Sequence, residues 1–259
     1  SIIQGSGIGP TLYIVMKSDL TPVGITNVLL KYADDVDLLV PEQADVDLTA
    51  EFNHLKAWAA RNKMVINFQK TKELVFHRPN PRNIVYPVLV DGIEQVRVAK
   101  LLGIFVQSTL CCDEHVKYIL TVCSQRVYLL KLLRARGLQA QQLQQVCQAI
   151  IISRIQYALP AWGGFLSAVL RNRIDSFLRR LYRCGFMSSL TSIDQLLSTA
   201  DQTLFLKTLN SCHCLNHLLP PPKEVSIQLR PAGHDRQLPI CKYRLFKESF
   251  IVRCLFSLC

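Results

Sequence analysis

The sequence predicts an α+β chain, in which strands and helices are mixed up to about residue 110 and helices dominate beyond it. Before residue 110, short runs of strand-forming residues alternate with turn signals; after it, apolar residues recur at steps of three and four. Hydrophobic residues make up 49% of the 259 positions, which suffices for a buried core. We therefore expect two folded domains, residues 1–110 and 111–219, followed by a basic segment, 220–259, whose fold the pattern does not indicate.

The first predicted elements are a helix and a β-hairpin. Pro10 fits the first position of a helix after a glycine-dense turn, because that position needs no backbone N–H. Two runs rich in strand formers follow, 28–30 and 36–40, on either side of Tyr32-Ala33-Asp34-Asp35. They predict a hairpin with two acidic side chains at its tip.

The rest of the first domain is expected to hold one helix and several strands. Leu48, Phe52, Leu55 and Ala59 recur at helical spacing. The predicted strands are residues 64–68, 74–76, 84–90, 93–98 and 101–106. Asp91-Gly92, between two of these runs, is the signal for a type I′ hairpin turn.

The second domain is predicted to be helical. Helical periodicity extends over residues 113–130, 143–151, 174–181 and 204–219. Gly137 separates the first two helices like a C′ glycine, and the three prolines at 220–222 end the region because they cannot continue a helical hydrogen-bond ladder. Asp113 and Glu114 complement the macrodipole of a helix start, an interpretation we favour over a metal site formed with His115.

The charge balance indicates a polyanionic partner. Lys and Arg number 30 against 19 Asp and Glu, a formal charge of +11, and such a surplus neutralises phosphates and releases counterions. Nucleic acid is the expected partner, with a basic surface kept for solubility as the plainer alternative. Basic residues of the tail alternate with Tyr243, Phe246 and Phe250, which fits either nucleic-acid stacking or an ordinary surface helix.

Ten cysteines without a secretory signal indicate reduced thiols and a nuclear or cytoplasmic location. The tightest group, Cys212-His213-Cys214, lacks the paired spacing of a structural zinc site, so helix-packing thiols are favoured. No apolar run is long enough to span a membrane. The start at Ser1 suggests a truncated chain.

Asp34 and Asp35 are the candidate metal ligands. Adjacent carboxylates at a tight turn repel one another unless a cation neutralises them. Mg²⁺ (or Mn²⁺) binds a few carboxylate oxygens together with substrate phosphates, and a pair of such ions stabilises the attacking and leaving oxygens of a phosphoryl displacement. An isolated Asp pair is more often a solvated turn. The flanking apolar strands, Tyr32 and the upstream glycine turn favour the metal site here.

Several motifs resemble those of reverse transcriptases from non-LTR (LINE-type) retrotransposons. Tyr-Ala-Asp-Asp at 32–35 resembles the YxDD box of these enzymes, and Gln-Gly-Ser-Gly-Ile-Gly-Pro at 4–10 resembles their preceding QG box. Further similarity lies in Trp58, Asn67, Lys70, Thr71 and Phe76, in Leu-Leu-Gly-Ile at 101–104, and in Tyr-Ala-Leu-Pro-Ala-Trp-Gly at 157–163. The resemblance covers most of the chain and becomes loose after residue 190.

This resemblance implies a partial polymerase palm, an antiparallel sheet with packed helices, followed by a thumb-like helical domain. Asp34 would be a catalytic metal ligand and Asp35 its partner with a more variable metal contact. Tyr32 would lie near the primer terminus, and Gln4 and Gly5 against the template base and the incoming nucleotide.

The implied activity is RNA-directed DNA polymerisation, the extension of a DNA primer on an RNA template with deoxynucleoside triphosphates. Lys70 would lie near the nucleotide and stabilise or protonate the leaving pyrophosphate, with an exposed turn lysine as the equal alternative. The family's palm supplies another metal-binding aspartate from a strand before the QG box. Residues 1–259 do not contain that strand, so the chain alone is expected to be inactive.

Two alternatives remain open. The first alternative to a reverse transcriptase is a non-catalytic nucleic-acid-binding module, including an inactive retroelement remnant. The second is the palm of an RNA-dependent RNA polymerase. Polymerases of the latter kind more often carry glycine before the Asp pair, where this sequence has Ala33. The oligomeric state is not indicated.

Overall fold

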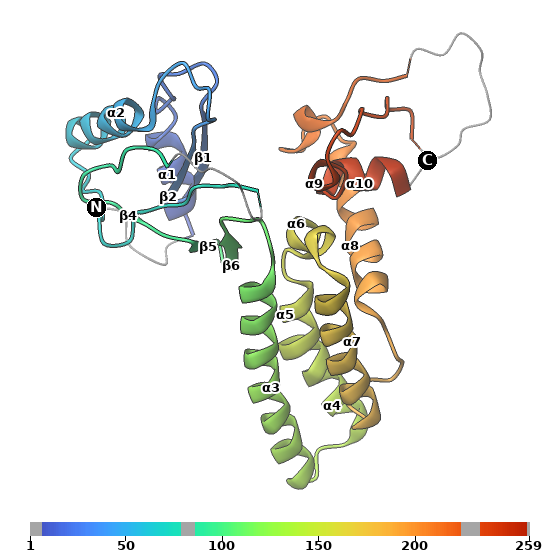
Figure 1. Ribbon diagram of the computed structural model, residues 1–259. Coiled ribbons are helices and arrows are strands. Elements are labelled where there is room, and N and C mark those ends of the chain that lie inside the picture. The colour runs from blue at the N-terminus through green and yellow to red at the C-terminus, as the bar shows by residue number, and fades with distance from the viewer. Residues whose placement is uncertain (1–6, 79–85, 224–233, 258–259) are drawn as a thin grey trace. The chain divides into compact units, whose positions relative to one another are not determined.

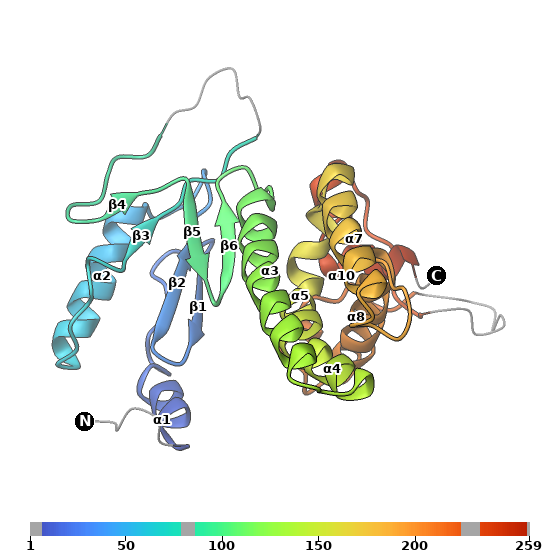
Figure 2. The same ribbon diagram turned by 90° about the horizontal axis from the view of Figure 1, so that it is seen from below.

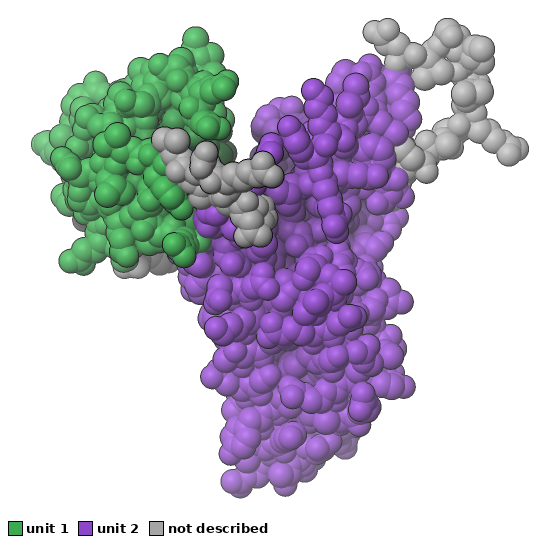
Figure 3. Space-filling model, in the orientation of Figure 1, with its two compact units in different colours: residues 1–75, 81–97 green, residues 76–80, 98–259 purple. Residues whose placement is uncertain are grey.

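The computed structural model describes residues 7–78, 86–223 and 234–257 (Figure 1). The chain divides into two compact units, residues 1–75 with 81–97 (unit 1) and residues 76–80 with 98–259 (unit 2), which are coloured separately in Figure 3. Helices and strands are mixed, as an α+β chain requires. The predicted boundary near residue 110 falls inside unit 2.

Unit 1 contains short helices and strand pairs. Its described elements are α1 (Gly9–Met16), β1 (Val28–Tyr32), β2 (Asp35–Leu39), α2 (Leu48–Arg61), β3 (Lys72–Glu73) and β4 (Glu94–Gln95). β1 pairs with β2 antiparallel and β3 with β4 parallel. Unit 2 adds a further antiparallel pair, β5 (Val98–Leu101) with β6 (Ile104–Gln107), so the described strands form three two-stranded sheets. Two of these pairs are antiparallel, like the expected palm sheet, and β3–β4 is parallel.

The core of unit 1 forms where α2 covers one face of the β1–β2 hairpin. Asp47 caps α2 by accepting the Ala50 N–H at 2.7 Å. Trp58 and Ala59 on α2 are buried with Leu20, and Leu29 of β1 packs against them. The predicted helix and hairpin are both confirmed, and the burial holds the hairpin in place by its inner face.

The predicted strand at 64–68 is wrong. Lys63 ends α2 in the left-handed conformation (φ 54°), and the Met64 N–H donates to the Ala59 carbonyl at 2.8 Å. Met64 and Ile66 then pack against the Trp58 cluster as irregular chain. Their alternation therefore reflects burial on one side rather than strand pairing. The predicted strand at 74–76 is also wrong, because pairing stops at β3.

The type I′ hairpin is present at a different place from the predicted one. At Asp91-Gly92 only Gly92 has positive φ (80°), whereas a type I′ turn needs it at both central residues, and 86–90 form no strand. Residues 84 and 85 lie outside the described part. Two central residues with positive φ between paired strands occur instead at Leu102 (φ 44°) and Gly103 (φ 90°). They join β5 (Val98–Leu101) to β6 (Ile104–Gln107), which pair antiparallel. This turn divides the predicted single strand at 101–106.

Unit 2 contains this hairpin and a helical bundle, whose first helix lies beside β6 (Figure 2). Its described helices are α3 (Asp113–Ala135), α4 (Ala140–Cys147), the π-helix η1 (Gln148–Ile152), α5 (Ser153–Gln156), α6 (Leu159–Trp162), the 3₁₀ helix η2 (Gly163–Phe165), α7 (Ala168–Arg183), α8 (Ile193–Thr208), the 3₁₀ helix η3 (Asn216–Leu218), α9 (Arg244–Lys247) and α10 (Phe250–Ser257). Apolar side chains of α3 to α8 share one buried core. Within the described residues, no helix is long and apolar enough to cross a membrane.

Local signals account for several helix ends in unit 2. Gly137 (φ 89°) follows α3, with its own N–H bonded to the Arg134 carbonyl and the Leu138 N–H to that of Leu133, a Schellman motif. The predicted helix at 204–219 is wrong beyond Thr208, where α8 ends. There the Asn216 side chain donates to the Thr208 carbonyl at 2.9 Å and closes the helix.

The tail after residue 220 folds back onto α8. Cys254 and Leu255 of α10 are buried against Phe205 of α8. Cys123 and Cys147 are likewise buried, in the main helical core. The short helices α9 and α10 thus belong to unit 2, although the sequence pattern did not indicate their fold.

Candidate active site

The acid pair lies at the tip of the β1–β2 hairpin. Tyr32 pairs with Asp35, which leaves Ala33 and Asp34 as a two-residue turn. Ala33 has φ 49°, in the left-handed region that such turns require at their first central position. Both aspartates are exposed, and the Tyr32 side chain is 64% exposed. The predicted acidic hairpin tip is therefore present.

The strand register places further side chains on the same face. Residues directly opposite one another across an antiparallel pair project to the same side, so Tyr32 accompanies Asp35, and Leu30 accompanies Asp37. Asp37 is half-buried, and burial together with the negative charge of Asp35 raises its pKa. The outer face of the hairpin thus carries acidic, aromatic and apolar groups side by side.

Lys17 lies beneath the turn and was missed by the sequence reasoning. Its side chain is 2% exposed, and its ammonium donates to the main-chain carbonyls of Ala33 at 2.9 Å and Asp34 at 2.7 Å. Burial lowers the pKa of Lys17, while the negative charges of Asp34 and Asp35 oppose this shift. The sequence feature that could have indicated this role is a single lysine directly after the apolar helix 9–16.

A second buried charge holds the loop that leads into β1. Glu51 of α2 is 1% exposed and accepts the N–H groups of Val23 at 3.1 Å and Gly24 at 2.6 Å and the side-chain amide of Asn27 at 2.8 Å. Burial disfavours its charged form, but these hydrogen bonds outweigh burial and lower the pKa of Glu51. The hairpin is thereby anchored at its base as well as at its tip.

The other predicted site residues are not brought to the acid pair by any described contact. Lys70 is exposed, and its backbone N–H closes a turn on the Asn67 carbonyl at 3.1 Å. Within the described chain its ammonium makes no hydrogen bond or ion pair. Gln4 and Gly5 lie outside the described residues. Asp19, which was not predicted to be a site residue, accepts the Trp58 indole N–H at 3.1 Å.

The donor set at the tip suits a hard divalent cation held jointly with a substrate. Across residues 7–78, 86–223 and 234–257, no group of three or more His, Cys, Asp or Glu side chains is arranged to hold a metal. Asp34 and Asp35 thus offer at most two adjacent carboxylates. Mg²⁺ is commonly bound by one or two carboxylates, with waters and phosphates completing its shell, so the two residues fit this ion.

Positive charge is concentrated in unit 2. Unit 2 has 21 Lys and Arg against 8 Asp and Glu, whereas unit 1 has 9 against 11. An open groove of about 450 Å³ runs between α3 and α7 and is lined by Leu120, Val169, Asn172, Arg173 and Ser176. Beside it, Arg180 donates to the Ser124 hydroxyl at 3.3 Å.

The chain thus combines an exposed carboxylate pair in unit 1 with a surplus of positively charged residues in unit 2. The chain is similar to a probable RNA-directed DNA polymerase from transposon BS of Drosophila melanogaster, with 28% identity over 175 residues. The similarity covers 62% of this chain and 19% of that protein, so the chain spans about a fifth of the relative's length. No family model and no solved structure matches the chain. The comparisons therefore support a distant, partial relationship to an RNA-directed DNA polymerase.

Proposed function

We propose that this chain is part of a reverse transcriptase of the non-LTR type, which extends a DNA 3′ end on an RNA template. Unit 1 corresponds to part of the palm and the helices of unit 2 to the thumb. The observation that carries the proposal is the exposed Asp34–Asp35 pair on a hairpin tip anchored from beneath, in a chain similar to a transposon polymerase.

The acid pair is the centre of the proposed chemistry. Asp34 and Asp35 hold Mg²⁺ (or Mn²⁺), which, when bound, stabilises the charge that develops on the attacking and leaving oxygens of nucleotidyl transfer. Tyr32 projects from the same face of the hairpin as Asp35. Its exposed aromatic ring contacts the sugar or base of the primer terminus. Gln4 and Gly5 are assigned to the template base and the deoxynucleoside triphosphate by resemblance alone.

Lys70 is assigned to the leaving pyrophosphate. It is exposed and its ammonium makes no described ion pair, so its three donors are available to phosphate oxygens. The groove between α3 and α7 of unit 2 would hold the phosphate backbone of the template and primer, because Arg173 lines it and Arg180 lies beside it, and guanidinium groups bind phosphate oxygens in pairs.

Primer extension tests the proposal. The longest reading frame that contains this chain, expressed with the unchanged residues, is expected to extend a DNA primer on an RNA template with Mg²⁺. Asp34→Asn with Asp35→Asn should abolish extension while leaving RNA binding intact. Asp91→Asn is the matched control, an exposed aspartate at another tight turn of unit 1, and should extend like the unchanged protein. Equal extension by all three proteins would refute the role of the acid pair.

A non-catalytic nucleic-acid-binding module is the second candidate, favoured by the charge difference between the two units. The same experiment separates the two functions. Salt-sensitive RNA binding without extension by any of the proteins would leave the binding module, because binding needs only the basic surface.

A further inference from the structure

Lys17 is one of the largest fully buried side chains of the described chain, and it ends beneath the acid-bearing turn. It comes from the C-terminal end of α1, not from the hairpin itself. Both of its hydrogen bonds go to main-chain carbonyls of the turn, those of Ala33 and Asp34, while the carboxylates of Asp34 and Asp35 stay exposed. A buried ammonium is costly unless it is satisfied, so this placement is specific.

The turn needs such a support. Ala33 has φ 49°, a conformation that glycine adopts freely and that residues with a Cβ adopt rarely. Bonds to the carbonyls of both turn residues fix the orientation of the two peptide groups, and with them the directions of the side chains they carry. Lys31 of β1 adds a second tie, since its ammonium donates to the Lys17 carbonyl at 2.5 Å.

We infer that Lys17 is the positioning residue of the acid pair: it holds residues 33 and 34 in the one turn conformation that presents both carboxylates to a single divalent cation. The inference rests on the proposed function and adds a residue to it. The direction of the change in cation affinity distinguishes a positioning residue from a nearby positive charge. A buried positive charge that merely sat near the site would repel an incoming cation, so its removal would tighten cation binding, whereas loss of a positioning residue weakens it.

The first test measures Mn²⁺ affinity of the full 259-residue chain from the electron paramagnetic resonance signal of free Mn²⁺. Lys17→Met, which keeps the length of the side chain but removes its charge and donors, should weaken binding at least about tenfold, the scale seen for residues that orient metal ligands. Lys56→Met is the charge-matched control in the same unit; its ammonium lies over the Phe52 ring, 5.3 Å from the centroid, and its loss should leave affinity unchanged. Unchanged or tighter Mn²⁺ binding by Lys17→Met would overturn the inference.

A rescue separates positioning from general support of the fold. Glycine at position 33 adopts the turn conformation without help, so Lys17→Met with Ala33→Gly should regain most of the lost Mn²⁺ affinity. Amide hydrogen exchange over residues 29–38, measured without metal, should be faster in Lys17→Met and slower again in the double variant. Failure of the glycine to restore either quantity would contradict a positioning role.

A variant of the acid pair itself keeps the inference distinct from the proposed function. If Mn²⁺ binding survives Asp34→Asn with Asp35→Asn, the acid pair does not hold the cation, and the proposed function and the inference fall together. If that variant loses Mn²⁺ while Lys17→Met binds it normally, only the inference fails.

Discussion

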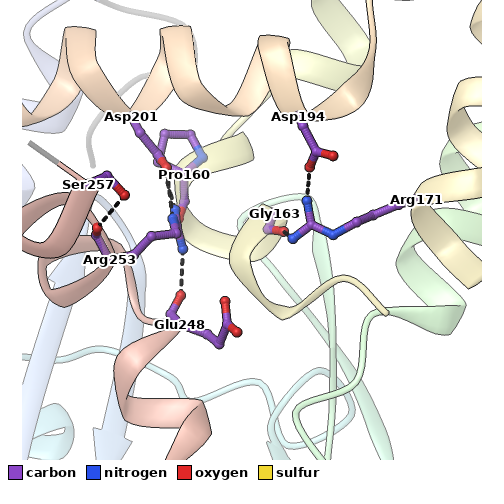
Figure 4. A network of polar contacts seen from close by, with 8 residues as sticks. All are labelled: Pro160, Gly163, Arg171, Asp194, Asp201, Glu248, Arg253 and Ser257. Carbon is purple, nitrogen blue, oxygen red and sulfur yellow. Dashed lines mark hydrogen bonds and ion pairs between the residues drawn. The ribbon is translucent and has the colours of Figure 1, made fainter. Parts of the chain in front are cut away.

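Arg253 donates to both carboxylate oxygens of Asp201, from Nε at 2.7 Å and from Nη2 at 2.8 Å, and so ties α10 to α8 (Figure 4). Both side chains are almost fully buried, at 13% and 11% exposure. Arg253 also donates to the carbonyls of Pro160 at 2.9 Å and Glu248 at 2.5 Å. The guanidinium thus satisfies groups from three separate stretches of unit 2, which explains how a tail without a clear sequence pattern becomes ordered.

Arg253→Met is expected to lower the free energy of unfolding by about 3 kcal/mol or more, because it leaves the Asp201 carboxylate buried without its cation. Urea unfolding measures the change. Arg244→Met is the control: Arg244 is 84% exposed in its ion pair with Glu248, and its loss should cost less than about 0.5 kcal/mol. Adding Asp201→Leu to Arg253→Met should recover part of the loss. An Arg253→Met chain as stable as the original would contradict the assignment.

Acid is expected to destabilise unit 2 through His115. This side chain is 2% exposed, and its ring lies 4.9 Å from that of Trp162 between centroids. Burial, with a smaller effect from Arg154, lowers the pKa of His115 to about 4, against 6.5 for the free side chain. Between these values the unfolded chain binds the proton more tightly, so stability falls as pH drops through this window, by on the order of 3 kcal/mol in total.

The measurement for His115 is the urea midpoint at about pH 7 and about pH 4.5. His115→Asn keeps an acceptor for the Phe105 N–H, which His115 Nδ1 accepts at 3.2 Å, but cannot titrate. The variant should therefore lose less stability on acidification than the original chain. Equal losses in the two proteins would show that His115 does not titrate in this way.

Gly103→Ala should destabilise unit 2 by about 1–2 kcal/mol, since φ 90° is unfavourable for alanine. The new Cβ would also lie 3.3 Å from the Tyr157 ring, whose hydroxyl donates to the Leu102 carbonyl at 2.8 Å. Gly137→Ala is the matched control that measures only the cost of the unfavourable backbone conformation, because φ is 89° there and no atom lies within 4 Å of an added Cβ. Thermal melting should show the larger shift for Gly103→Ala, and the reverse order would contradict the close approach of Tyr157.

RNA binding by the chain is expected to weaken steeply with salt and to depend on arginines of unit 2. Arg173 and Arg183 of α7 are exposed and form no ion pair among the described residues. Replacing both with Gln should reduce the slope of log affinity against log salt by about 0.7 for each phosphate of a single strand that these arginines neutralise. Fluorescence anisotropy with an RNA oligonucleotide between about 50 and 200 mM KCl measures the slope.

Arg61→Gln with Lys56→Gln removes the same charge from unit 1 and serves as the control. This variant should leave the slope nearly unchanged. An equal reduction by both pairs would mean that net charge, rather than the surface of unit 2, governs RNA binding.

Local sequence patterns predicted the α+β composition, α1 with Pro10 in its first turn, the hairpin with its acidic tip, α2, and α3 with Asp113 and Glu114 in its first turn. These features depend on local propensity and on apolar periodicity, which neighbouring residues largely decide. The metal role of Asp34 and Asp35, and the roles of Tyr32, Lys70, Gln4 and Gly5, stay predictions.

Contacts between distant parts of the chain set three other features: which turn forms the type I′ hairpin, where the tail packs, and which side chain lies beneath the acid pair. Asp91-Gly92 carries the stronger local turn signal, yet the β-hairpin forms at Leu102-Gly103, where Tyr157 from a distant helix end reaches the turn. Lys17 and Arg253 likewise act across 16 or more positions of the chain. Such contacts form because buried charges and main-chain carbonyls must find partners once the chain is compact, and residue spacing alone does not reveal which partners those are.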